Sequence, residues 1–190
     1  SLWGLTGALI LHNLSMHCIN STWVLFTMVR FDWGPRETGL SFAAFGVVAL
    51  VYQLGIARWV LPRWGDKRVM LVGLAVASIE YAAYAFATRG WMVYVIMLAG
   101  GIGLLGGQAA QGLLSAQVGD DEQGALQGAL AALMSVTGIV APLLATDLFA
   151  YFTRPAAQPP VPGIAFLLAG ALNVLAFLLA LRVLARARRV

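Results

Sequence analysis

A single carboxylate interrupts the apolar segment "LVGLAVASIEYAAYAFA", residues 71–87, and it belongs to Glu80. If this segment is a helix across a bilayer, Glu80 lies about 10 Å from its outer end, at 1.5 Å per residue, with Tyr84 on the same side. An acid at this depth can gain and lose a proton as a water-filled cavity opens. The structural alternative is a protonated Glu80 bonded to a neighbouring amide or tyrosine, and the residues alone leave both open.

Amide and imidazole side chains form further polar strips in apolar surroundings. Asn13, His17 and Asn20 follow i, i+4, i+7 spacing, which places them on one face of a helix. Such a strip is costly against lipid, so it predicts a cavity lining, with hydrogen bonding between helices as the alternative. Gln53 and Gln127 are expected to line the same cavity, Gln127 near its inner mouth.

These groups predict neither a metal site nor a catalytic set. His12 and His17 point about 140° apart on a helix, which makes them a poor metal pair. Cys18 is the one cysteine, so the chain has no internal disulfide and no thiol pair. No nucleophile stands at useful spacing from a base, so we do not expect an enzyme. The net charge of +4 comes from residues in short joins, which does not predict nucleic-acid binding.

The composition indicates what positions these groups. Hydrophobic residues make up 61% of the 190 residues and charged residues 11%, whereas a soluble domain carries about a quarter charged residues. A helix needs about 20 apolar residues to cross the hydrocarbon of a bilayer. The sequence therefore predicts an all-α membrane protein, one bundle of six spans at about 3–28, 39–61, 69–87, 91–114, 124–149 and 163–184.

The basic residues between these ranges predict the orientation. Eight of the twelve Lys and Arg residues fall on one side and four on the other. Because the side richer in Lys and Arg faces the cytoplasm, both ends of the chain are expected there. The eight are Arg58, Arg63, Lys67, Arg68, Arg182, Arg186, Arg188 and Arg189.

Glycines are concentrated in two of the predicted helices. "GGIGLLGGQAAQG" lacks the preceding strand that a nucleotide-binding loop requires, so Gly103 and Gly107 are expected to let helices pack closely. Gly124 and Gly128 are assigned the same role at the start of the fifth span. Pro142 is expected to bend that helix.

Five segments together resemble one family. They are "TWVLFT" (22–27), "RFDWGPRETGLSFAAFG" (30–46), "RWGDKRVMLVGLA" (63–75), "AFATRGWMVY" (85–94) and "DDEQGALQGALAALMSVTGIVAPLL" (120–144). Their order resembles the C-terminal half of the TetA-like tetracycline/H⁺ antiporters of the major facilitator superfamily. The resemblance implies helices seven to twelve of two six-helix bundles around a central cavity, driven by a proton gradient without a cofactor.

The resemblance also assigns residues. It implies that "RWGDKR" is a cytoplasmic gate whose charge contacts change as the two halves rock. The family's histidine in helix eight falls at Ala49 and its aspartate in helix nine at Ala77, whereas its glutamine is present as Gln53. We hypothesise that Glu80 replaces the missing aspartate. The gate residues are Arg63, Gly65, Asp66, Lys67 and Arg68.

The function expected from these features is proton-coupled export of a drug-like small molecule by alternating access. The alternatives are a carrier for another amphipathic molecule or metabolite, and a six-helix module that does not transport. The expected partners are a small-molecule substrate, the lipid bilayer and the N-terminal half of the same transporter. That half is absent here, and because residue 1 is not Met we expect the chain to be a piece of a longer one.

Overall fold

A computed structural model describes residues 2–156 and 159–187, and the regular secondary structure in these ranges is helical. This confirms the expected all-α class. Two pairs of helices are joined end to end, α2 to α3 by a π-helical turn at Val51–Ile56 and α5 to α6 by a 3₁₀ turn at Gly101–Gly103. The helices are α1 (Leu2–Phe31), α2 (Pro35–Leu50), α3 (Ala57–Trp64), α4 (Asp66–Phe86), α5 (Gly90–Gly100), α6 (Leu104–Ser115), α7 (Gln123–Thr153) and α8 (Ile164–Ala187).

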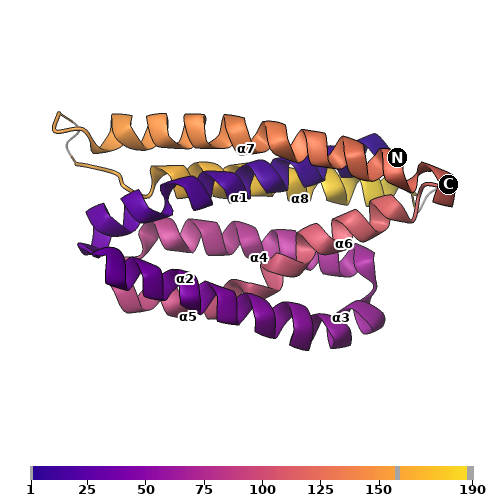
Figure 1. Ribbon diagram of the computed structural model, residues 1–190, viewed down its shortest axis with the longest axis horizontal. Coiled ribbons are helices and arrows are strands. Elements are labelled where there is room, and N and C mark those ends of the chain that lie inside the picture. The colour runs from indigo at the N-terminus through magenta and orange to yellow at the C-terminus, as the bar shows by residue number, and fades with distance from the viewer. Residues whose placement is uncertain (1, 157–158, 188–190) are drawn as a thin grey trace.

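The helices run roughly along one direction (Figure 1). α8 packs against both α1 and α4, while α7 covers the other side of α1 and α6 crosses α4. α2 and α5 lie together on the far side of α4 from α7. Both ends of the chain lie at the same end of the bundle as the α3–α4 junction and the α6–α7 connection. The bundle therefore has one end that carries both termini and another that carries the α7–α8 connection.

Two apolar clusters hold the bundle together. One is rich in aromatic rings, with the Phe26 and Phe166 centroids 4.4 Å apart and Trp23 beside Phe166. The other is mainly aliphatic and includes Met70 and Leu105, both fully buried. Many large apolar side chains nevertheless remain on the outside of α2, α5, α7 and α8. An apolar exterior of this extent is what contact with lipid or another apolar surface requires.

Four segments are long and apolar enough to cross a membrane: Pro35–Phe86, Gly90–Ser115, Gln123–Thr153 and Ile164–Arg186. The first of them includes both the α2–α3 stretch and α4, which are separated by Gly65. α1 is also long enough to cross a membrane, but it is not among these four segments. Its mean hydropathy is lowered by its polar side chains, which include His12, Asn13, His17 and Asn20. The six ranges expected from the sequence lie on these helices to within one residue, and their assignment as membrane spans stays a prediction.

The turns between helices follow from local chemistry. Pro35 opens α2, where its missing N–H costs no hydrogen bond, and the Glu37 carboxylate accepts the Gly34 N–H at 3.0 Å. Gly65 ends α3 with φ +73°, a backbone conformation that side chains disfavour, and the chain then enters α4. The π-helical turn and the 3₁₀ turn were not predicted. These two turns are in contact with each other. The Tyr52 ring lies over Gly101, and the Tyr52 hydroxyl donates to the Leu98 carbonyl at 2.8 Å.

Candidate functional site

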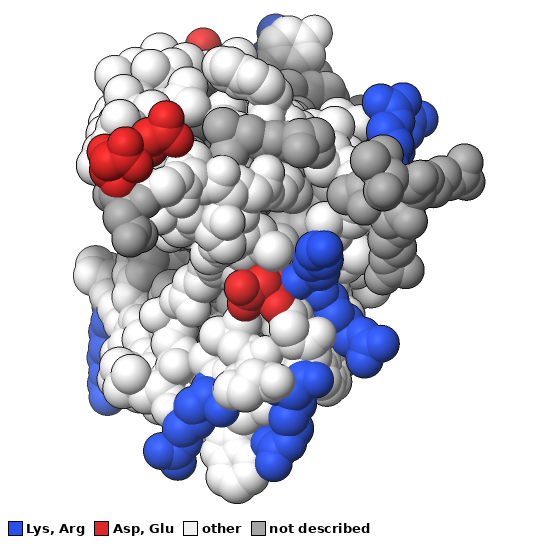
Figure 2. All heavy atoms as spheres, turned by 90° about the vertical axis from the view of Figure 1, so that its right-hand side faces the viewer, with Lys and Arg blue, Asp and Glu red and all other residues white. Residues whose placement is uncertain are grey.

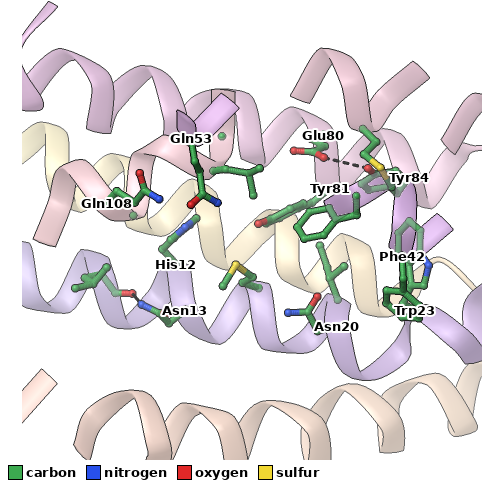
Figure 3. A pocket seen from close by; sticks show the side chains of 18 of the residues that line it. His12, Asn13, Asn20, Trp23, Phe42, Gln53, Glu80, Tyr81, Tyr84 and Gln108 are labelled. Atoms are coloured by element: carbon green, nitrogen blue, oxygen red, sulfur yellow. Dashed lines mark hydrogen bonds between the residues drawn. The ribbon is translucent and has the colours of Figure 1, made fainter. Parts of the chain in front are cut away.

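A cavity of about 440 Å³ is lined mainly by α1, α2, α4, α6 and the two irregular turns, with one methionine each from α5 and α7. Polar groups line it in two places (Figure 3). We call one place the imidazole end, lined by His12, Asn13, Gln53 and Gln108, and the other the acid end, lined by Trp23, Phe42, Glu80 and Tyr84. Tyr81 lies between them in Figure 3. Met16, Ile19 and Met97 supply apolar surface, so the cavity is suited to a molecule with both polar and apolar parts.

Glu80 is held at the acid end by one hydrogen bond and one glycine. The Tyr84 hydroxyl donates to Glu80 Oε1 at 3.0 Å. The Glu80 carboxyl group occupies the space beside Gly100, where a Cβ atom would overlap it. Tyr84 is positioned by edge-to-face contact with Trp23, at 5.2 Å between centroids, and Trp23 Nε1–H donates to Ser41 Oγ at 2.9 Å. Among the described residues that line the cavity there is no Lys or Arg, so in this part of the chain Glu80 faces the cavity without a cationic partner.

The two positions at which the resemblance predicts a missing family side chain, Ala49 and Ala77, have distinct surroundings. Ala77, at the aspartate position, is 1% exposed and packs against Gly103, where a Cβ atom would lie 3.0 Å from the Ala77 methyl group. It is not among the cavity-lining residues, whereas Glu80, one turn later, is. Ala49, at the histidine position, does not line the cavity, although Gln53 does. The acid at Glu80 therefore enters the cavity from a position where the helices leave room for it.

The polar strip on α1 is divided by the structure. Asn13 and Asn20 line the cavity, and Asn13 Nδ2 also donates to the Leu9 carbonyl at 2.9 Å. His17 is not among the lining residues, and its Cε1 lies 3.7 Å from where a Cβ atom on Gly138 of α7 would be. At 100° per residue, His17 lies about 40° beyond Asn13, which turns it from the cavity towards α7. Its predicted role as a lining residue has no support from this placement.

Gln127 lies outside the cavity as well. Its Nε2 donates to Ser115 Oγ at 3.3 Å, across the connection between α6 and α7. Gln123 makes a similar contact to the Ser115 carbonyl at 2.8 Å. The amide predicted for the inner mouth thus fastens the start of α7 to the end of α6.

A buried network at the imidazole end is the feature that sequence reasoning missed. The fully buried Asn173 of α8 pairs through Oδ1 with His12 Nδ1 at 2.7 Å. Its Nδ2 donates to the Leu74 carbonyl at 2.7 Å and to Ser78 Oγ at 3.0 Å. Asn173 therefore links α1, α4 and α8. The signal was present, because Asn173 is the only polar side chain in "IAFLLAGALNVLAFLLAL", residues 164–181, as Glu80 is the only charged side chain in residues 71–87.

The expected gate residues lie at the junction of α3 and α4. Asp66 is in the first turn of α4, and its Oδ2 lies 3.4 Å from the position of a Cβ atom on Gly112 of α6. Arg63 stacks over the Trp59 ring at 4.7 Å. In the part of the chain that the structure describes, Arg63, Lys67 and Arg68 make no ion pair. Figure 2 shows this end of the bundle, with basic side chains around much of its edge.

The glycines expected to permit close helix packing divide into two groups. Gly103 faces Ala77 and Gly107 faces His12, so both bring α6 close to its neighbours. One close approach of two helix backbones was not predicted: a Cβ atom on Gly73 of α4 would lie 2.6 Å from the Cα of Gly106 of α6. A Cβ atom added to Gly124 or Gly128 would have no atom of the described residues within 4 Å, so neither glycine packs against another helix in this part of the chain. Pro142 lies inside α7, which continues from Gln123 to Thr153.

The described residues contain no group of three or more His, Cys, Asp or Glu side chains that could hold a metal ion. Cys18 is buried in the aromatic-rich cluster, with its Sγ 3.8 Å from the Ala141 carbonyl oxygen. The chemistry that the cavity offers is therefore hydrogen bonding and the acid of Glu80.

Helices with an apolar exterior around a partly polar cavity define a class, the helical membrane proteins that bind small molecules between their spans. The chain belongs to the Major Facilitator Superfamily, whose family model matches residues 5–190. This membership confirms the expected family, and it points to transport rather than to enzymatic catalysis.

Individual relatives agree with the family match. A class C tetracycline resistance protein from Escherichia coli is 43% identical over 128 residues, which cover 67% of this chain and 32% of that protein. A class G tetracycline resistance protein from Vibrio anguillarum is 39% identical over 130 residues, covering 67% of this chain and 32% of that protein. The chain thus spans about a third of the length of these curated relatives.

Proposed function

We propose that this chain is the C-terminal six-helix half of a proton-coupled exporter of drug-like small molecules. The observation that carries the proposal is the placement of Glu80, whose carboxyl group lines the cavity beside Gly100 with Tyr84 as its bonded partner. A carboxyl group in this position can exchange a proton with cavity water when the cavity is open. Substrate release coupled to that exchange needs no cofactor, only a proton gradient.

An alternating-access mechanism also requires a second wall for the cavity. We infer that an N-terminal half supplies it, because Phe42 and Phe45 line the cavity yet remain 48% and 40% exposed in this chain. The substrate would bind between the two halves and be released as they rock against each other. In this arrangement the lipid bilayer covers the apolar outer faces of the helices.

The proposed orientation places both ends of this chain in the cytoplasm of a cell with the protein in its inner membrane. Arg63 and Lys67 lie at the α3–α4 junction and Arg186 in the last turn of α8, at the bundle end that carries both termini. A cluster of Lys and Arg marks the cytoplasmic side of membrane proteins. Arg188 and Arg189 of the predicted set lie outside the described residues. The gate function proposed for Arg63, Gly65, Asp66, Lys67 and Arg68 belongs to this cytoplasmic end.

The proposal is tested by Glu80→Gln in the full-length gene product, reconstituted in vesicles with an imposed proton gradient. Because glutamine keeps the shape but cannot release a proton, we expect proton-driven export to fall about tenfold or more and to lose its dependence on the gradient. Asp147→Asn is the matched control, since Asp147 is an exposed acid of α7 outside the cavity. Export by Glu80→Gln with unchanged pH dependence would contradict the proposal.

The surroundings of Ala49 and Ala77 favour one alternative, a carrier for another amphipathic molecule. The relatives are named for tetracycline resistance, but this chain lacks the two side chains that the family resemblance places there. Export assays with tetracycline and with amphipathic compounds of unrelated structure separate the two functions. A carrier of the second kind would move such compounds and leave tetracycline behind.

A further inference from the structure

The hydrogen bonds of Asn173 fix which ring nitrogen of His12 carries the proton. The Ser78 hydroxyl donates to the Leu74 carbonyl at 2.8 Å, so its oxygen accepts from Asn173 Nδ2. Nδ2 also donates to the Leu74 carbonyl, so the amide group of Asn173 cannot be reversed without setting two acceptors against each other. Its Oδ1 must therefore face His12. Because a carbonyl oxygen only accepts, His12 Nδ1 has to be the donor in the 2.7 Å contact.

The second ring nitrogen of His12 is left for the cavity. A neutral imidazole with its proton on Nδ1 has an acceptor lone pair on Nε2. Among the described residues no side chain or carbonyl group is hydrogen-bonded to His12 Nε2. Every fully buried side-chain nitrogen or oxygen in these residues has a hydrogen-bond partner, so Nε2 is not fully buried. It lies at the cavity surface beside Gly107, where a Cβ atom would come within 3.1 Å of it. The missing side chain at Gly107 keeps the Nε2 edge open.

We propose that His12 is the hydrogen-bond acceptor of the substrate site, receiving a hydroxyl or N–H donor of the bound molecule through Nε2. This deepens the proposed function and rests on it, since it supposes that the cavity binds the transported molecule. Gln53 and Gln108 line the same imidazole end and add amide groups that both donate and accept. The ligand class is an amphipathic molecule whose polar edge carries donors and whose apolar part contacts the aromatic rings of the acid end.

The proton position can be measured without any transport assay. The chain has two histidines, so ¹⁵N-histidine labelling of the purified full-length protein in lipid nanodiscs can be assigned with His12→Gln and His17→Gln. The signals that disappear in His12→Gln report on His12. We expect Nδ1 to be protonated and Nε2 bare at neutral pH, and Asn173→Leu to abolish that preference. A His12 ring with its proton on Nε2, or on both nitrogens, would overturn the proposal while leaving the Glu80 experiment unaffected.

The acceptor role is tested by closing the Nε2 edge with Gly107→Ala. Two probes are compared by calorimetric binding: tetracycline, which carries hydroxyl and amide donors, and tetraphenylphosphonium, which carries none. We expect tetracycline binding to weaken about three- to tenfold, the range for one hydrogen bond, and tetraphenylphosphonium binding to stay the same. Gly39→Ala is the control for an added methyl group, because a Cβ atom on Gly39 would have no atom of the described residues within 4 Å.

The outcomes of this comparison are distinct. Equal weakening of both probes would show a loss of space rather than of an acceptor, and unchanged tetracycline binding would show that Nε2 is not used; either overturns the proposal. If the unmodified protein binds neither probe, the cavity does not bind this class of molecule, which contradicts the proposed function. The ¹⁵N measurement still decides the orientation of His12 in that case, and it also serves if Gly107→Ala does not fold.

Discussion

His12 and Glu80 line the same cavity, but the protein around them differs in how firmly it holds each side chain. His12 is 5% exposed and is bonded to Asn173, which in turn bonds two groups of α4. Glu80 is only partly buried, and its one hydrogen bond comes from Tyr84, a residue one turn away on the same helix. The hydrogen-bond network of His12 thus joins three helices, whereas the one hydrogen bond of Glu80 stays within α4.

This difference has a physical reason. A fully buried amide is costly unless all of its polar atoms are bonded, so Asn173 can remain inside the bundle only with its complete set of partners. Once bonded, it stabilises one arrangement of α1, α4 and α8. An acid that must exchange protons requires the opposite, namely access to water and a partner that does not fix it permanently. Similar sequence signals, a lone amide in one apolar helix and a lone charged residue in another, therefore have two different structural outcomes.

Asn173→Ala should give the largest change in stability. It leaves His12 Nδ1–H without an acceptor and removes the link between α1, α4 and α8. We expect the free energy of unfolding to fall by about 2–4 kcal/mol. Cys18 is fully buried, so the temperature at which a thiol-reactive dye labels it reports unfolding of this region. Asn20→Ala is the control, because Asn20 is exposed at the cavity, and it should shift that temperature little. Equal shifts would erase the contrast between the two ends.

Gly100→Ala should disturb the acid end without unfolding the bundle. The added methyl group overlaps the Glu80 carboxyl group, which is the free end of a flexible side chain and can move into the cavity. We expect proton-driven export to fall about three- to tenfold, with thiol labelling of Cys18 nearly unchanged. Gly39→Ala again serves as the control for an added methyl group. A loss of stability as large as that of Asn173→Ala would show that the Glu80 position is a packing element.

The class of fold and the positions of the helices could be predicted from composition and the lengths of the apolar runs. The two irregular turns within these helices could not be predicted. The turn at Val51–Ile56 and the turn at Gly101–Gly103 depend on each other, since the Tyr52 ring fills the space that the glycine leaves. Such a contact joins residues about fifty positions apart in the chain, and helical periodicity carries no information about it.

The site was predicted in part for a related reason. Periodicity placed Asn13 and Asn20 on one face of a helix, and both line the cavity. Periodicity does not give the width of the helix face that lines the cavity, so the prediction included His17. His12 was considered only as a metal ligand and was rejected in that role. The position of a polar residue on its own helix is local information. Whether Asn173 of α8 stands opposite that residue is decided by packing.

Tyr84→Phe should have the smallest overall effect of the three variants, with a smaller loss of export than Gly100→Ala. It deletes the hydroxyl group that donates to Glu80, while the ring keeps its edge-to-face contact with Trp23 and its place beside Phe166. The free energy of unfolding should therefore change by less than about 1 kcal/mol. Because Glu80 loses the donor that orients it, the initial rate of proton-driven export should fall about two- to fivefold.

Tyr151→Phe is the matched control, since Tyr151 is an exposed tyrosine of α7 that contacts Arg154 away from the cavity. Export rates in vesicles and thermal labelling of Cys18 should be measured on the same preparations of both variants. A slower rate with unchanged labelling would place the role of the hydroxyl group in the cavity. If Tyr84→Phe instead lowered the labelling temperature as far as Asn173→Ala does, the Glu80–Tyr84 pair would be a structural bond between buried groups. The two ends of the cavity would then hold their polar residues for the same reason.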